Sequence, residues 1–348
     1  MKPRNHFKFL SLSLILTLAV GLYNCKPTPS EPEIPKFEED FKGVKLPDVT
    51  PTTPKAATTT AASIQTSTAV SSVATAAAAG PSAPAIVSAT TNMQKIVSTT
   101  EAAELVAAFT PAVISNLQTT GALPADLSIK VNAIASNPAF AAYLPKVTLP
   151  TVDGKVVTGA VKESTFDKNQ PLITFPNYSV AAITSPCTDA AQAAYNTKKA
   201  EIDAARATQV ASVTNTYTAA VTAANASGAS CSSAIPGKYA TLKTGAATEL
   251  NAGLAALLSA KAILGEGNYN LLVLLYYSAY VTNLNALSNL QTAELNACAT
   301  LVTASIANAA AARDADLANI TVNYNSQMST LQSILTAGFQ KCHDQGQG

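Results

Sequence analysis

The stretch that decides the fold of this 348-residue chain is residues 264–281, which read LGEGNYNLLVLLYYSAYV. Its Gly265-Glu266-Gly267 segment is a turn signal. After the turn, residues 268–337 contain no glycine or proline, which predicts one long helix. Residues 236–264 before the turn have a helical pattern as well. The chain is therefore expected to be mainly α-helical, with a long antiparallel helical hairpin folded at this turn.

Four cysteines give the hairpin a register. Cys187 and Cys231 are 44 residues apart, and the same spacing separates Cys298 from Cys342, symmetrically about the turn. A 44-residue helix is roughly 66 Å long, whereas a disulfide needs Cα atoms within about 7 Å, so pairing within one arm is excluded. Exported chains commonly oxidise an even set of cysteines. We therefore predict the disulfides Cys187–Cys342 and Cys231–Cys298 in a hairpin of residues 187–342.

An apolar seam supports the same register. In the second arm, apolar residues recur in steps of 4, 4 and 3, an 11-residue repeat that is typical of a nearly straight helix pair. The first arm repeats these steps between Tyr195 and Ala224. The seam of the second arm is Cys298, Val302, Ile306, Ala309, Arg313, Leu317, Ile320, Tyr324, Met328, Leu331, Leu335, Phe339 and Cys342.

Two arginines interrupt this seam at matched places. In the antiparallel register Arg206 falls near Tyr324, and Arg313 falls near Tyr217. Each pair is interpreted as a lock on the register, with a ligand site as the other interpretation. The acidic residues Asp203, Asp314 and Asp316 are expected on solvated helix faces.

The first arm has an expected break. Residues 228–237 contain Gly228, Gly237 and Pro236, which predict an interruption between a helix over 189–226 and the helix that follows. A rival fold is an up-down-up-down bundle with another turn near Cys298. That bundle also permits both disulfides, but it needs a turn where there is no glycine or proline.

Residues 271–281 are apolar around the whole helix, so a two-helix hairpin alone cannot cover them. One interpretation is packing against Leu250, Leu254, Leu257 and residues 97–180. The other is an interaction surface for a protein partner or a second copy. That surface would consist of Leu272, Leu275, Tyr276, Tyr277 and Tyr280.

Residues 97–186 are expected to form a small mixed α/β unit. Ser98 to Glu101 match a helix capping box, and Pro111 should split the helix that follows. Short helices are expected over 125–135 and 138–144. Asp153-Gly154 between β-branched residues predicts a hairpin. The unit is interpreted as a collar on the helices rather than a separate binding domain.

The N-terminus has the pattern of an export signal over residues 1–24. Lys2, Arg4 and Lys8 precede an apolar run that ends in Leu22-Tyr23-Asn24-Cys25. This ending resembles the lipobox of bacterial lipoproteins, in the loose form found in spirochaetes, although Asn24 replaces the usual Gly or Ala. The resemblance implies that Cys25 is diacylated and becomes the mature N-terminus. The alternative is a plain cleaved signal with a free Cys25.

The lipobox implies a protein anchored in the cell envelope by its N-terminal lipid. Lys26, which follows the lipidated cysteine, lacks the acidic character of the common retention signal, so the outer membrane is expected. Residues 25–96 are rich in Pro, Thr and Ala and are expected to be a disordered tether. Residues 343–348 are expected to be a tail.

Composition excludes several functional classes. Only 12% of residues are charged, and loss of Lys2, Arg4 and Lys8 leaves 19 basic against 21 acidic residues, so no nucleic-acid partner is expected. His343 would be the one histidine of the mature chain, which argues against a Ser-His-Asp triad or a His-rich zinc site. No cofactor, metal or enzymatic activity is predicted. The expected function is a structural or protein-interaction role, and the alternative is binding of an apolar small ligand.

Overall fold

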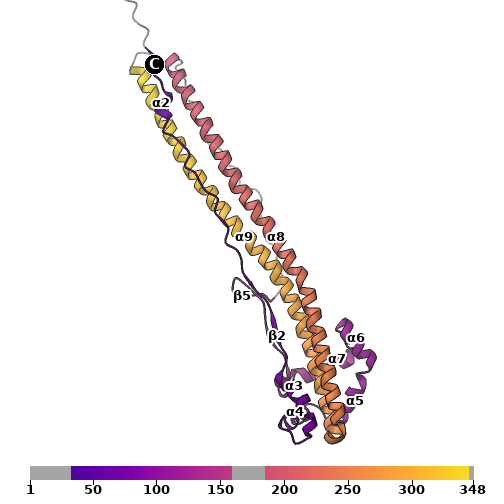
Figure 1. The fold of residues 1–348 in the computed structure, drawn as a ribbon. Helices are drawn as coiled ribbons and strands as arrows, with labels where there is room; N and C mark the ends of the chain where they lie inside the picture. The colour runs from indigo at the N-terminus through magenta and orange to yellow at the C-terminus, as the bar shows by residue number, and fades with distance from the viewer. Residues whose placement is uncertain (1–32, 159–184, 345–348) are drawn as a thin grey trace, which may run out of the picture. The chain divides into compact units, whose positions relative to one another are not determined.

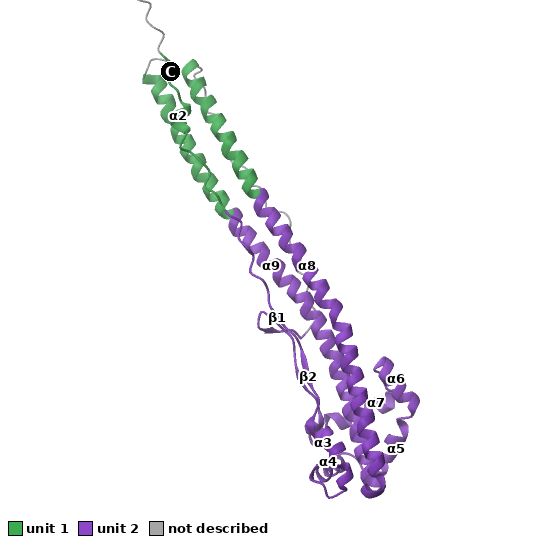
Figure 2. Cartoon of the chain, in the orientation of Figure 1, with its two compact units in different colours: residues 1–49, 173–210, 318–348 green, residues 50–172, 211–317 purple. Residues whose placement is uncertain are grey.

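The computed structural model describes residues 33–158 and 185–344; the predicted signal peptide, Cys25 and residues 345–348 lie outside them. The chain divides into two units (Figure 2). Unit 1 comprises residues 1–49, 173–210 and 318–348, and unit 2 comprises residues 50–172 and 211–317.

Two helices dominate the fold, α8 (Pro186–Leu264) and α9 (Glu266–Asp344). A single residue connects them. Gly265 has a φ of +75°, a left-handed conformation that glycine adopts without strain, and its N–H donates to the carbonyl of Lys261. The predicted turn is confirmed (Figure 1). Because α9 is continuous through Cys298, the rival four-helix bundle was wrong.

The expected break at residues 228–237 was also wrong, because α8 continues through it. Gly228 serves close packing: a Cβ there would lie 2.2 Å from Cγ2 of Val302 in α9. Pro236 lies inside the helix, where proline costs roughly 3 kcal/mol. Packing against α9 on both sides of this segment, and the disulfide at Cys231, offset that cost.

Both predicted disulfides are present, with one in each unit. Cys187–Cys342 lies in unit 1 and Cys231–Cys298 in unit 2, each with a Cα–Cα distance of 5.8 Å. No seam position of α9 between Cys298 and Cys342 is exposed, and the same is true of the first-arm seam from Tyr195 to Ala224. The 11-residue repeat therefore marks the contact between the helices within each unit.

Unit 1 contains a short helix, α2 (Glu38–Phe41), that packs on α8 and α9. Phe37 and Phe41 are each 2% exposed, and the Phe41 ring meets Tyr195 edge-on at 6.4 Å. The Lys341 ammonium donates to Asp40 at 2.8 Å. These contacts hold the chain just after residue 33 against the helix pair.

The flexible tether expected over 25–96 is therefore wrong for its described part, residues 33–96. A proline-rich segment has few backbone partners of its own, so helix side chains supply them. In unit 1, the Gln209 amide donates to the carbonyl of Pro47. In unit 2, the Thr52 N–H and hydroxyl both donate to the Asp316 carboxylate at 2.7 Å. Composition alone does not reveal this pairing.

Two small antiparallel sheets lie in the described part of unit 2. The first has the strand order β1-β4-β5, and the second pairs β2 with β3. The turn between β4 and β5 is Asp153-Gly154, with both φ angles positive, as the sequence predicts. The strands are β1 (Thr59–Thr60), β2 (Ser63–Gln65), β3 (Lys146–Thr148), β4 (Thr151–Val152) and β5 (Lys155–Val156).

The described residues of unit 2 also form seven short helices. They are α3 (Thr68–Ala76), η1 (Ala77–Ala79), α4 (Pro84–Gln94), α5 (Thr99–Ala108), α6 (Pro111–Thr120), α7 (Ala125–Ser136) and η2 (Pro138–Tyr143). The Ser98 hydroxyl caps α5 by accepting the Glu101 N–H, and Pro111 opens α6, both as predicted. With residues 271–281 these helices form the largest apolar core of the described chain.

Candidate functional site

The surface predicted at Leu272, Leu275, Tyr276, Tyr277 and Tyr280 is not exposed. All five side chains are at most 8% exposed and belong to the core of unit 2. The Tyr277 ring stacks on Phe109 of α5 at 4.3 Å between centroids. By length and composition α9 contains an 18-residue window apolar enough to cross a membrane, and 28% of that window is buried. Residues 271–281 are themselves buried within unit 2. The interpretation that this stretch packs against Leu250, Leu254, Leu257 and the described part of residues 97–180 is confirmed, and the interaction surface was wrong.

The two matched arginines lie where the register places them. The Arg206 guanidinium lies 4.5 Å from the ring centroid of Tyr324 in unit 1, and Arg313 lies 4.5 Å from that of Tyr217 in unit 2. A guanidinium over an aromatic face is attracted to the π-electrons. Each pair joins α8 to α9 inside one unit, which favours the interpretation as a register lock.

Asp203 extends the arginine pair of unit 1 into a polar network. It accepts the Tyr324 hydroxyl at 2.8 Å and the Lys199 ammonium at 2.6 Å. Burial acts to raise the pKa of Asp203, but the hydrogen bonds from Lys199 and Tyr324 outweigh it and hold the pKa below its usual value. The carboxylate is therefore charged in the folded state and contributes to the contact between the helices.

We predict that Asp203→Asn lowers the free energy of unfolding of unit 1 by at most about 1 kcal/mol at neutral pH, because the network is partly exposed. A carboxyl with a lowered pKa stabilises the fold above its unfolded-state pKa, and that stabilisation is lost as the pH falls through the folded-state pKa. The difference between wild type and variant should thus vanish in acid. Urea unfolding followed over a pH series measures it. Asp48→Asn, at an exposed position of the same unit, is the control; a difference that persists in acid would contradict the prediction.

Asp316 and Glu294 hold the extended segment of unit 2, and sequence reasoning missed both. Asp316 is 4% exposed, so its expected place on a solvated face was wrong. Glu294 is 6% exposed and accepts the N–H of Ala62 and the ammonium of Lys238, each at 2.6 Å. The sequence signal that was overlooked is an acidic residue beside the apolar seam. Such a residue can accept hydrogen bonds from an extended segment that has no backbone partners of its own.

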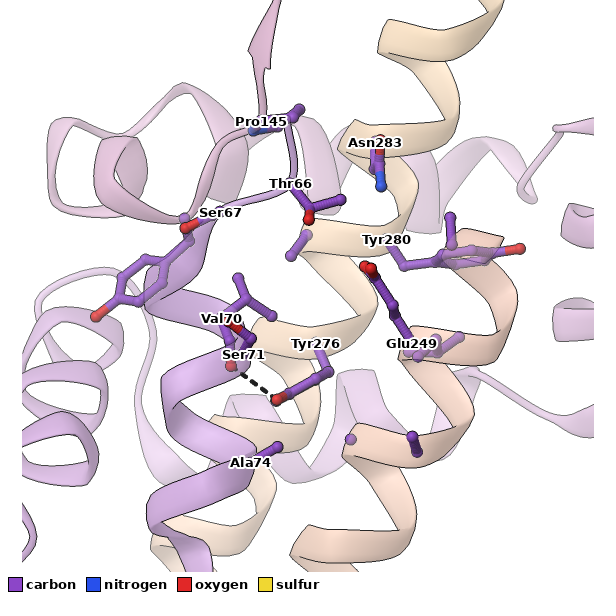
Figure 3. Close-up of a pocket in the computed structure, with 16 residues that line it drawn as sticks. Thr66, Ser67, Val70, Ser71, Ala74, Pro145, Glu249, Tyr276, Tyr280 and Asn283 are labelled. Atoms are coloured by element: carbon purple, nitrogen blue, oxygen red, sulfur yellow. Dashed lines mark hydrogen bonds between the residues drawn. The ribbon is translucent and has the colours of Figure 1, made fainter. Parts of the chain in front are cut away.

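A pocket of about 270 Å³ lies in unit 2 between α3 and the α8–α9 pair (Figure 3). The Tyr276 hydroxyl crosses to α3 and donates to the carbonyl of Val70 at 2.7 Å. Burial raises the pKa of Tyr276 to about 12, so this phenol stays neutral. The residues that line the pocket are Thr66, Ser67, Val70, Ser71, Ala74, Tyr143, Pro145, Ala246, Glu249, Leu250, Ala252, Gly253, Tyr276, Ala279, Tyr280 and Asn283.

Local features of the chain build the pocket walls. The Ser67 hydroxyl caps α3 by accepting the N–H of Ala69 and also donates to the carbonyl of Ala142, which ties α3 to η2. Gly253 leaves room for an aromatic ring, because a Cβ there would lie 2.0 Å from Cε1 of Tyr276. The wall from α3 was missed, since its Ala/Thr/Ser-rich sequence was assigned to the tether.

Glu249 and Asn283 contribute polar groups to the pocket wall. Figure 3 shows the Glu249 carboxylate directed into the pocket, and no Lys or Arg of the described chain forms an ion pair with Glu249. Figure 3 shows the amide nitrogen of Asn283 directed into the pocket, whereas its Oδ1 is enclosed and has no hydrogen-bond partner within residues 33–158 and 185–344. Buried amide groups are ordinarily hydrogen-bonded, so this one is unusual.

No group of three or more His, Cys, Asp or Glu side chains that could hold a metal ion occurs in the described parts of the chain. Comparison of the chain with protein-family models, curated proteins and solved structures finds no match.

Proposed function

We propose that this chain is a lipid-anchored cell-envelope protein with a non-catalytic structural or protein-interaction role. The observation that carries the proposal is the pair of cross-helix disulfides, one in each unit. Such bonds persist in oxidising compartments outside the cytoplasm. Export is also what the N-terminal sequence indicates, and the lipobox-like ending at Cys25 supports an anchor, expected in the outer membrane.

The position of α2 supports a short connection between the anchor and unit 1. Glu33, the first described residue, is eight residues after Cys25. Eight residues reach at most about 28 Å in any conformation. Since Phe37 and Phe41 are buried on the helix pair, a lipid on Cys25 would keep Glu33, and with it the end of unit 1 that carries α2, near the membrane surface.

The polar clusters support a structural role. Asp316 and Glu294 bind the extended N-terminal segment, and Asp203 joins the two long helices. Each of these acidic groups is already engaged in an internal contact. The outer faces of the helices are then the surface offered to a protein partner or to a second copy of the chain.

We predict that Cys25→Ser moves the protein from the detergent phase to the aqueous phase in detergent phase separation, because no acyl chain can be attached. The N-terminal peptide of the wild type should carry a diacylglyceryl group by mass spectrometry. Asn24→Gly, which restores the usual lipobox residue, is the control and should stay lipid-anchored. A wild type with a free Cys25 would overturn the anchor.

A second candidate function is binding of a small ligand with an apolar part, and the pocket of about 270 Å³ favours it. Its size lies just below the range of pockets that hold drug-sized molecules. Its wall includes Tyr276, Ala279 and Tyr280 from residues 271–281, and Tyr143 and Pro145 from residues 97–180. A ligand in the pocket would therefore lie between these two segments. Native mass spectrometry after gentle purification tests this function, because a retained small molecule would support it.

A further inference from the structure

We propose that the pocket beside Tyr276 takes a small organic ammonium ion with an apolar or aromatic group, in preference to a neutral or anionic ligand. The proposal rests on the second candidate function and names its ligand class. It follows from the charge of the pocket and from its apolar wall.

One residue supplies the charge of the pocket. Of the 16 described residues that line the pocket, Glu249 is the one with a formal charge. A carboxylate only accepts hydrogen bonds, and its field in a concave, partly apolar site attracts a cation and repels an anion. Because no Lys or Arg of the described chain pairs with Glu249, an ammonium group from outside the chain can do so.

The remaining wall is apolar. The side chains of Val70, Ala74 and Leu250 and the Tyr276 ring contribute to it, and Gly253 adds no side chain. Such a surface favours a hydrocarbon or aromatic group through burial of apolar area. A cavity of about 270 Å³ limits that group to less than the size of a drug-like molecule.

The experiment titrates the full mature protein with phenethylamine by isothermal calorimetry. Two probes of the same shape, neutral 2-phenylethanol and anionic 3-phenylpropanoate, are titrated in parallel. Phenethylamine should bind at least about fivefold more tightly than 2-phenylethanol, as expected for a partly exposed charged hydrogen bond, and 3-phenylpropanoate should bind most weakly.

Variants assign the binding to this pocket. Glu249→Gln should lower the affinity for phenethylamine to that for the neutral probe, and it should fold because Glu249 is exposed. Gly253→Ala should weaken the binding of both phenethylamine and 2-phenylethanol, because the added Cβ would displace the Tyr276 ring. Glu104→Gln, an exposed charge outside the pocket, is the matched control.

The outcomes distinguish a failure of the ammonium preference from a failure of small-ligand binding. If 2-phenylethanol binds as tightly as phenethylamine, or if Glu249→Gln changes nothing, the ammonium preference is wrong while small-ligand binding stands. If none of the three probes binds and native mass spectrometry shows no retained ligand, both are wrong.

Discussion

Replacing Cys187 and Cys342 by serine should lower the free energy of unfolding of unit 1 by about 3–5 kcal/mol. The two cysteines are 155 residues apart in sequence, and the chain-entropy model assigns roughly 4–5 kcal/mol to a loop of this length. Both sulfur-bearing side chains are fully buried in the core of unit 1, next to Ala191 and Leu335. That core otherwise depends on α2 and the helix seam, so little else offsets the loss.

Hydrogen exchange with mass spectrometry measures this effect where it occurs. Amides of residues 187–210 and 318–342 should lose protection in the double variant, while those of residues 271–281 should keep it. The control is Cys231→Ser with Cys298→Ser, which removes the disulfide of unit 2 and should leave unit 1 protected. Unchanged exchange in residues 187–210 would show that the bond does not stabilise unit 1.

The helix pair could be predicted because the signals that specify it are spacings along the sequence. The 44-residue cysteine spacing, the turn at Gly265 and the 11-residue repeat each specify the same antiparallel register, and each is visible in the sequence. The arginine–tyrosine pairs followed from that register without further input. Short local signals, such as the Ser98 cap and the Asp153-Gly154 turn, were equally readable because they involve neighbouring residues.

The break expected at Pro236 shows where local signals mislead. Glycine and proline weaken a helix, but their cost is small beside the packing of a long helix on its partner. Gly228 is needed because Val302 approaches too closely for a side chain, a fact of tertiary contact that no window of the sequence contains.

The extended N-terminal segment could not be predicted for a related reason. Its order comes from side chain to backbone hydrogen bonds over long sequence separations, such as Thr52 to Asp316 across 264 residues. Composition suggests solvation for such a chain, and only the position of Asp316 on the neighbouring helix reverses that expectation. The pocket depends on the same effect, since α3 belongs to this segment.

Leu275→Ala should lower the free energy of unfolding of unit 2 by about 2–5 kcal/mol. Leu275 is fully buried in the largest core, so its truncation removes apolar burial and leaves a cavity that the surrounding helices fill only partly. Leu258→Ala is the matched control on α8: that side chain is 62% exposed, and its loss should cost no more than about 0.5 kcal/mol.

Urea unfolding followed by near-ultraviolet circular dichroism suits this comparison, because the chain has no Trp and Tyr276, Tyr277 and Tyr280 lie beside Leu275. A loss near 3 kcal/mol for Leu275→Ala with little change for Leu258→Ala means that residues 271–281 are the core that fixes the small helices onto α8 and α9. A loss below about 1 kcal/mol would mean that these helices leave the stretch uncovered in solution. An apolar surface at Leu272 and Leu275 would then be open to a partner or to a second copy of the chain.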